Sequence, residues 1–202
     1  MKNIITIQHT QSLQHINGMI GSWTDWELTE KGKIQAKNIG MKLSSEYQNK
    51  TFKLYSSPLK RSLQTAEIVA EHFDVDIIFD DLLKERNLGS AVGKSVAWFR
   101  KNMQQEEHTI DDRYFDDAES RRDLWNRLLP FYERILDLDD ENIIIVSHGD
   151  TLSVFNAMWL GLGVEFLNTG NLHGLAGGVS FLHLKENGKK TISGLNDTYY
   201  LR

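Results

Sequence analysis

The chain of 202 residues contains no cysteine and no long apolar run. Without cysteine it can form no disulfide framework and no thiolate metal site. A reducing cytoplasm fits this composition, so we expect a cytoplasmic protein. A membrane-spanning helix needs about 20 apolar residues, which no stretch approaches, and the apolar part of the N-terminal segment is too short for a signal peptide. We therefore expect no membrane partner.

An excess of basic residues is also missing. The chain carries 23 lysine and arginine residues against 28 acidic ones, a formal net charge of −5. It offers no positive field for a polyanion, so we expect no nucleic-acid partner. Its 40% hydrophobic and 25% charged residues are ordinary for a globular protein. The length suits one domain with a sizeable core, and no repeat or linker divides it.

Short apolar runs alternate along the chain with segments of helical periodicity. The runs predict strands over residues 3–8, 52–56, 75–79, 142–147, 177–184 and 190–195. The periodic segments predict helices over residues 29–47, 57–72, 94–105, 119–137 and 150–160. This order predicts an α/β fold: a three-layer sandwich with a mostly parallel sheet of about six strands, an antiparallel edge and helices on both faces.

Two of these helices carry more specific signals. Thr29 is expected to cap the first one, with Ile34, Ile39 and Leu43 among the residues that face inward. In the helix over residues 119–137, apolar residues recur at spacings of three and four, which predicts one buried face.

Both prolines of the chain fall in predicted helices. Ser57 followed by Pro58 is typical of an N-cap and a first helical position. Pro130 lies inside a helix, where we expect a kink or a break. Overall we expect a single domain over residues 1–202, in which residues from about 94 to 138 form a helical, cap-like insertion.

Two histidines, His9 and His148, each directly follow a predicted buried strand. If strands 3–8 and 142–147 are neighbours, both imidazoles face one crevice at the carboxyl ends of the strands, where ligands bind in open α/β sheets. A single histidine at a strand end is most often a hydrogen-bonded structural residue. Two in matching positions favour a catalytic site.

Three further residues complete a candidate site for phosphoryl transfer without a metal. Arg61, in the first turn of a predicted helix, carries a planar fork that matches phosphate oxygens. Gly149, at the start of the helix after His148, would let the backbone approach an anion closely. Glu85, in a loop, would serve as a general acid if partial burial raised its pKa. Taken singly, the arginine and the glutamate would be ordinary surface residues.

At these residues the chain resembles the histidine phosphatase superfamily, the phosphoglycerate-mutase-like group. The resemblance is carried by Gln8-His9-Thr10, by Trp23-Thr24-Asp25 and the segment from Leu28 to Gly32, by the segment from Ser56 to Ala66, by Glu85, and by Val146-Ser147-His148-Gly149. It runs from about residue 4 to residue 160, and the order and spacing of the motifs make it specific. It implies a phosphoric monoester hydrolase that needs neither cofactor nor metal.

The resemblance also implies a role for each matching residue. His9 is the nucleophile that forms a phosphohistidine, Arg61 and His148 bind the phosphoryl group, and Glu85 is the proton donor and later the base. His15 lies where many relatives place a substrate-contacting asparagine, so we assign a substrate contact to it.

The chain departs from the family pattern at Gln8, where the family has arginine. Glutamine keeps one amide donor but loses a full charge and the bidentate fork. Removing one transition-state donor typically costs on the order of 10²–10³ in rate. We therefore predict a weak enzyme, or one whose phosphate is held by something else. The loop residue His173 is a further histidine that could reach the site.

The substrate is expected to be a small phosphomonoester. Mutases of the family resemble a longer chain with an extra insertion, which 202 residues hardly accommodate. Residues 106–119 hold seven acidic side chains and one arginine. Such a run is normally a solvated face, but if it overhung the site it would repel polyphosphorylated substrates.

Three other functions are weighed against the phosphatase. A catalytically impaired pseudo-phosphatase that only binds a phosphorylated ligand is favoured by Gln8 and opposed by the intact nucleophile and acid. A phosphoglycerate-mutase-type phosphotransferase shares the same site. A metalloenzyme is disfavoured because no ligand spacing of the His-x-x-x-His kind occurs. The oligomeric state is open, a homodimer included.

Overall fold

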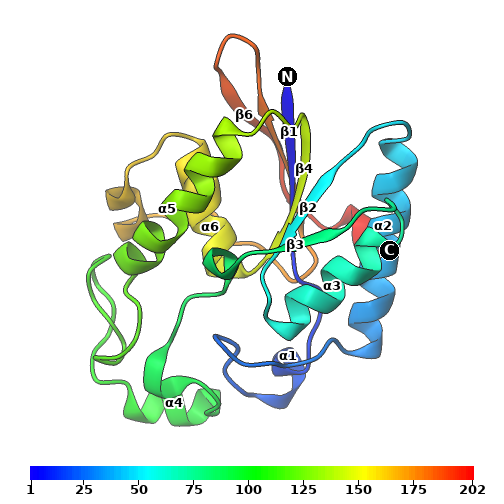
Figure 1. Cartoon of the computed structure of the whole chain (residues 1–202). Coiled ribbons are helices and arrows are strands. Elements are labelled where there is room, and N and C mark those ends of the chain that lie inside the picture. The colour runs from blue at the N-terminus through cyan, green and yellow to red at the C-terminus, as the bar shows by residue number, and fades with distance from the viewer.

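The computed structural model describes all residues, 1–202, and its centre is one six-stranded sheet (Figure 1). The strands are β1 (Lys2–Gln8), β2 (Lys53–Ser56), β3 (Ile77–Phe79), β4 (Asn142–Ser147), β5 (Val179–Leu184) and β6 (Lys190–Asp197), in the spatial order β3-β2-β4-β1-β5-β6. The first four in this order run parallel, and β5 and β6 pair antiparallel beyond β1. The predicted sheet, mostly parallel with an antiparallel edge, is confirmed.

Six α-helices surround the sheet. They are α1 (Gln14–Asn17), α2 (Glu30–Glu46), α3 (Lys60–Ala70), α4 (Val96–Asn102), α5 (Arg121–Asp137) and α6 (Gly149–Trp159). Short 3-10 helices lie at Asp81–Leu83, Gly89–Ala91, Val164–Asn168 and Tyr199–Leu201. Helices α2 and α3 cover one face of the sheet and α5 and α6 the other, which confirms the three-layer sandwich (Figure 1). None of the helices has both the length and the apolar composition that crossing a membrane requires.

Strand β4 shows why the sheet is covered on both faces. Ile143 and Ile145 belong to the core under α5 and α6, whereas Ile144 and Val146 belong to the core under α2 and α3. Successive side chains of a strand point to opposite faces, so a continuous apolar run is buried only between two layers. Burying one such side chain contributes about 1.5–3 kcal/mol. The apolar run therefore determines the layering of the fold.

Helix α2 confirms the capping prediction but corrects one of its inward residues. The Thr29 side chain accepts a hydrogen bond from the N–H of Gly32, as an N-cap does. Ile39 and Leu43 are buried, but Ile34 is 61% exposed, so its prediction as an inward residue is wrong. The buried stripe of α2 includes Gly32, whose Cβ position would lie 2.0 Å from the carbonyl oxygen of Gln11. The side of α2 that packs closest to the rest of the protein uses glycine. The apolar residue type alone therefore did not predict which side of α2 is buried.

The helix predicted from Ser57 and Pro58 begins later. Its first residue is Lys60, and Leu59 takes the N-cap position without a side-chain cap. The Oγ of Ser57 does accept the N–H of Leu59, at 3.3 Å, but it also lies 2.7 Å from Nε2 of His148. The serine-proline pair therefore precedes α3, and Ser57 Oγ links the N–H of Leu59 to the ring of His148.

Helix α5 is continuous through Pro130, so the expected break is not found. Proline removes one N–H and frees the carbonyl one turn earlier, that of Asn126. Both Pro130 and Asn126 are exposed, so water can satisfy the freed oxygen. A capping box between Ser120 and Asp123 secures the start of the helix.

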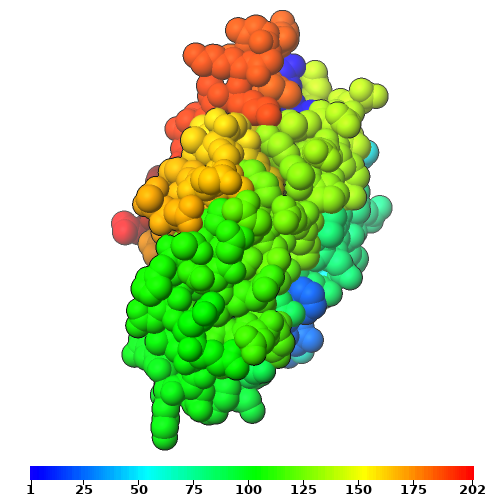
Figure 2. All heavy atoms as spheres, turned by 90° about the vertical axis from the view of Figure 1, so that its left-hand side faces the viewer, coloured from blue at the N-terminus to red at the C-terminus, as the bar shows by residue number.

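The stretch expected to form a cap-like insertion, residues 94–138, divides into two parts. Helix α4 packs with Phe115 and Ala118 in a small cluster of its own. This green segment forms the lower part of the face seen in Figure 2. Helix α5, by contrast, buries Leu124, Leu128 and Phe131 in the main core. That the part before α5 forms a cap over the site stays a prediction.

Candidate active site

The two histidines lie side by side at the carboxyl ends of β1 and β4. These strands are neighbours, as predicted, and Gln8 pairs with Ser147, so the residues that follow both strands leave the sheet together. The N–H of His9 donates to the carbonyl oxygen of Ser147 at 2.9 Å. The ring centroids of His9 and His148 are 5.2 Å apart. The topology of the sheet therefore brings together two imidazoles from opposite ends of the sequence.

The hydrogen bonds of His9 fix its tautomer. Its Nδ1 lies 2.9 Å from the carbonyl oxygen of Thr10, which can only accept, so Nδ1 carries the proton. Its Nε2 accepts a hydrogen bond of 3.1 Å from Nε of Arg61. Burial and the nearby Arg61 charge hold the pKa of His9 well below its usual value. The ring is thus neutral, with the lone pair of Nε2 directed at a cation.

Arg61 is anchored by main-chain oxygens. It is 1% exposed, and its Nη1 and Nη2 donate to the carbonyl oxygens of Thr24 and Ser22 at 2.8 and 2.9 Å. Burial lowers its pKa to about 10, so the guanidinium is still charged at neutral pH. Sequence patterns do not identify these two carbonyls, which belong to a loop between predicted elements.

His148 presents one ring nitrogen without a partner. It is 0% exposed, and its Nε2 lies 2.7 Å from Oγ of Ser57. The buried O–H of Ser57 has no acceptor other than Nε2, so it donates there, which leaves the proton of the neutral ring on Nδ1. Nδ1 is buried and has no hydrogen-bond partner. We call His9, Arg61 and His148 the floor of the site.

The positive charge of the floor lies on Arg61 and not on His148. Burial, Arg61 and His9 hold the pKa of His148 well below its usual value. The His148 ring is therefore neutral and offers an N–H.

Glu85 lies at the N-terminus of α6. Its Oε1 accepts from the N–H groups of Arg86 and Thr151 at 3.0 and 3.3 Å, and its Oε2 accepts from that of Asp150 at 3.4 Å. Burial and the neighbouring Asp150 carboxylate raise the pKa of Glu85 despite these donors and Arg61. A raised pKa is what a general acid near neutral pH requires.

At the N-terminus of α6, the N–H groups of Asp150 and Thr151 face Glu85 rather than an external anion. An anion contact at Gly149, the first residue of α6, stays a prediction. A Cβ at Gly149 would lie 2.5 Å from Cε1 of His173, so a larger residue there would displace the imidazole that packs on it.

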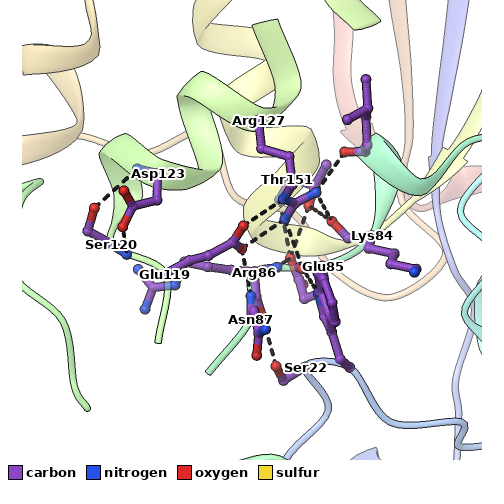
Figure 3. A network of polar contacts seen from close by, with 12 residues as sticks. Ser22, Lys84, Glu85, Arg86, Asn87, Glu119, Ser120, Asp123, Arg127 and Thr151 are labelled. Atoms are coloured by element: carbon purple, nitrogen blue, oxygen red, sulfur yellow. Dashed lines mark hydrogen bonds and ion pairs between the residues drawn. The ribbon is translucent and has the colours of Figure 1, made fainter. Parts of the chain in front are cut away.

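A network that the sequence did not predict holds the backbone around Glu85 (Figure 3). Arg127, from α5, donates to the carbonyl oxygens of Lys84 and Glu85, both at 3.1 Å, and to the carboxylate of Glu119 at 2.6 and 2.9 Å. The indole N–H of Trp23 donates to the same Glu85 carbonyl at 2.6 Å. In the sequence, Arg127 has the spacing of an ordinary helix-surface arginine, so only the tertiary structure identifies it.

A groove of about 440 Å³ opens beside the floor and is lined by Gln8, His15 and His173. The ring of His15 stacks on that of His9 with centroids 5.5 Å apart. Nδ1 of His173 lies 3.3 Å from Oδ1 of Asp150. We call Gln8, His15 and His173 the rim of the site. All the residues predicted for the site therefore lie at one end of the sheet.

The acidic run over residues 106–119 forms ion pairs rather than a purely solvated face. Glu107 is nearly buried and pairs with Arg86 at 2.9 Å. Glu119 pairs with Arg127 at 2.6 Å, and Asp111 with Arg122 at 2.6 Å. Arg86 also faces Asp150, with 3.6 Å between Nε and Oδ2. The run is thus tied to the segment that carries Glu85. No group of three or more histidine, aspartate or glutamate side chains is arranged to hold a metal ion.

Comparisons with known proteins identify similar sequences and a similar fold. The model of one family, the histidine phosphatase superfamily (branch 1), matches residues 4–198. The chain is 31% identical over 173 residues to 2-carboxy-D-arabinitol-1-phosphatase of Triticum aestivum, which is 83% of this chain but only 34% of that protein. It is also 31% identical over 166 residues to the 2,3-bisphosphoglycerate-dependent phosphoglycerate mutase of Thermoplasma acidophilum, 82% of this chain and 80% of the mutase.

A solved structure with a similar fold is that of mycobacterial glucosyl-3-phosphoglycerate phosphatase. It superimposes with a TM-score of 0.80 at 20% identity and covers 96% of this chain and 98% of its own. At this identity the likeness shows the fold. The chain spans about a third of the length of the wheat relative.

Proposed function

Because the chain belongs to the histidine phosphatase superfamily, we propose that it hydrolyses small phosphomonoesters through a phosphohistidine on His9. The predicted class, a phosphoric monoester hydrolase, agrees with the phosphatases among its relatives. The observation that carries the proposal is the floor itself. A neutral imidazole whose Nε2 lone pair faces Arg61, the guanidinium itself and an unpartnered N–H converge in one buried cluster.

In the first step, a bound phosphoryl group takes the place of His9 as the partner of Arg61. The lone pair of Nε2 of His9 attacks phosphorus in line, and the bond to the ester oxygen breaks. Glu85, whose pKa is raised by burial, gives a proton to the departing alkoxide. Arg61 and the Nδ1–H of His148 hold the equatorial oxygens, where the charge is spread.

In the second step, water cleaves the phosphohistidine. Glu85, now a carboxylate, takes a proton from the attacking water, and the bond between phosphorus and Nε2 breaks. Inorganic phosphate leaves, and His9 returns to its neutral form with the proton still on Nδ1. These steps use side chains of the chain alone, so we propose that the reaction needs no metal.

We also propose that Gln8 weakens this enzyme. Its amide can donate one hydrogen bond to a phosphoryl oxygen but brings no charge. The loss of one transition-state donor corresponds to on the order of 10²–10³ in rate.

Gln8 also supports a second candidate, a pseudo-phosphatase that binds a phosphorylated ligand without turning it over. A binder needs the cation and the N–H of the floor, but it needs neither a nucleophile nor a proton donor. Because one relative is a mutase, a phosphotransferase stays a further candidate function. A cytoplasmic location and a homodimer stay predictions.

Trapping the intermediate tests the proposal. The protein is mixed with a radiolabelled aryl phosphate and quenched in alkali, in which phosphohistidine is stable, whereas acid removes the label. We expect label in the wild type and none in His9→Ala, with turnover of the variant lower by about 10⁴-fold or more, the range seen when a nucleophile is removed. His108→Ala, at an exposed loop histidine, is the matched control and should label normally. Binding of inorganic phosphate without label or turnover in the wild type would favour the pseudo-phosphatase.

A further inference from the structure

The rim contains a charged pair that the steps above do not use. His173 lies in the loop before β5, and its Nδ1 lies 3.3 Å from Oδ1 of Asp150, the second residue of α6. The other edge of the ring packs on Gly149, where a Cβ would lie 2.5 Å from Cε1 and 2.9 Å from Nε2. Gly149 directly follows His148 of the floor. The imidazole of His173 therefore packs against the residue that follows His148 of the floor.

The loop that carries His173 is tied to the end of β1. The N–H of Gly177 donates to the carbonyl oxygens of Gln8 and His9 at 3.0 and 3.1 Å. A Cβ at Gly174 would lie 3.2 Å from Oε1 of Gln8, so the residue next to His173 touches the Gln8 side chain. At the start of the loop, the N–H of Leu172 donates to Oγ of Ser153 at 2.8 Å. The loop places His173 and Gln8 against the same groove.

We propose that His173, held by Asp150, supplies to the bound phosphoryl group the positive charge that the family arginine would supply at position 8. This inference rests on the phosphatase proposed above. Without this charge, a dianion in the groove would meet the neutral amide of Gln8 and, beyond the ring of His173, the half-exposed carboxylate of Asp150. An imidazolium paired with Asp150 both neutralises that carboxylate and offers its Nε2–H as a charge-assisted donor.

The charges around His173 favour its protonated form. The hydrogen bond to Asp150 and the carboxylates of Asp150 and Glu85 raise the pKa of His173, against the opposing effects of burial and of Arg121 from α5. Arg86, which also lines the space beside the ring, is paired with Glu107. A raised pKa means that the ring is cationic below that pKa and loses its charge as the pH rises through it. Anion binding should therefore weaken with rising pH.

Sulfate is a suitable probe because it stays a dianion from pH 5 to pH 9, whereas phosphate titrates in this range. The dissociation constant of sulfate is measured at several pH values for the wild type, His173→Gln and the exposed control His108→Gln. We expect His173→Gln to bind sulfate on the order of tenfold more weakly at pH 6, the loss typical of one charge-assisted hydrogen bond, and to converge with the wild type at high pH. In a Gln8→Arg background, the same substitution should have a smaller effect.

Equal affinities of the wild type and His173→Gln at pH 6 would overturn the inference, and so would an equal loss at every pH. If His173→Gln does not fold, the ring-proton resonance of His173 in the wild type gives the answer. It should titrate at higher pH with sulfate bound, and an unchanged titration would count against a contact. Sulfate binding does not require turnover. A protein that binds sulfate through His173 but forms no phosphoenzyme would therefore refute the phosphatase and keep this assignment.

Discussion

The floor and the rim of the site differ in burial and in what sets their protonation. The floor is nearly inaccessible to water, and all but one of its imidazole nitrogens have a partner in the protein. Burial and Arg61 keep both of its histidines neutral. The histidines of the rim are exposed, His173 to 48% in its side chain, and His173 is held by a single carboxylate.

This difference separates two tasks. A buried floor has one protonation state across the neutral range, so it can carry out a fixed sequence of bond changes. The exposed histidines of the rim respond to pH and to substitution, and beside them the buried Gln8 departs from the family pattern. The rim should therefore adjust affinity and rate, while the floor and Glu85 determine whether the reaction occurs.

The largest effect is expected from Glu85→Gln, which leaves the floor without its acid. Turnover of an alkyl phosphate should fall by about 10²–10⁴-fold, the usual contribution of general acid catalysis. p-Nitrophenyl phosphate has a leaving group that needs no proton, so its phosphorylation step should be affected far less. Steady-state kinetics on both substrates measure the ratio, and Glu106→Gln, at an exposed acidic residue, is the control. Equal losses on the two substrates would show that Glu85 is not the acid.

At the rim, Gln8→Arg should raise the rate. Adding a charged fork should increase turnover of an aryl phosphate by on the order of 10²–10³-fold in a His173→Gln background, and by less in the wild type, where His173 already supplies one charge. Gln48→Arg adds the same charge at an exposed position far along the sequence and should change nothing. If Gln8→Arg turns over no faster than the wild type, the lost charge is not what limits this enzyme.

The pH dependence of kcat/KM on an alkyl phosphate should distinguish the protonation of His9 from that of Glu85. Since the pKa of His9 is lowered by burial, the nucleophile stays neutral well below the ordinary histidine range. Since the pKa of Glu85 is raised by burial, the acid keeps its proton to higher pH than an ordinary carboxyl. kcat/KM should therefore fall as the pH rises through the pKa of Glu85, by about tenfold for each pH unit, in addition to the weaker anion binding that follows when His173 loses its proton. In His173→Gln only the limb of Glu85 should remain, and it should disappear when Glu85→Gln is added. A limb that survives in the double variant would belong to another group.

The smallest effect is expected from Trp23→Phe, which removes the indole N–H from the Glu85 carbonyl. Arg127 still donates to that carbonyl, so kcat on an alkyl phosphate should drop only a few-fold, in keeping with about 1 kcal/mol for one hydrogen bond. Trp125→Phe, in which no such bond is lost, is the matched control. A loss as large as that of Glu85→Gln would mean that Trp23 itself meets the substrate.

Particular residues mark the limits of prediction from this sequence. The alternation of buried strands and amphipathic helices predicted the sandwich, because period and composition are local properties. Ile34 was wrongly predicted to face inward because the close-packed side of α2 uses glycine. Ser57 was wrongly predicted to be the N-cap of α3, because its hydroxyl has a partner in a histidine about 90 residues away. Pro130 breaks no helix because its freed carbonyl faces water. Each of these outcomes depends on what packs nearby, which the local pattern does not contain.

The sequence by itself determined the layers of this protein, the order of its elements and the residue types of the floor, because buried apolar runs and strand-end histidines leave a local pattern. Only the tertiary structure decided the tautomer of His9, the neutral state of His148, the anchoring of Glu85 by Arg127 and Trp23, and the pairing of His173 with Asp150. These properties arise from burial and from donors that lie far apart in the chain. Proton positions and charges depend on distances that only folding creates.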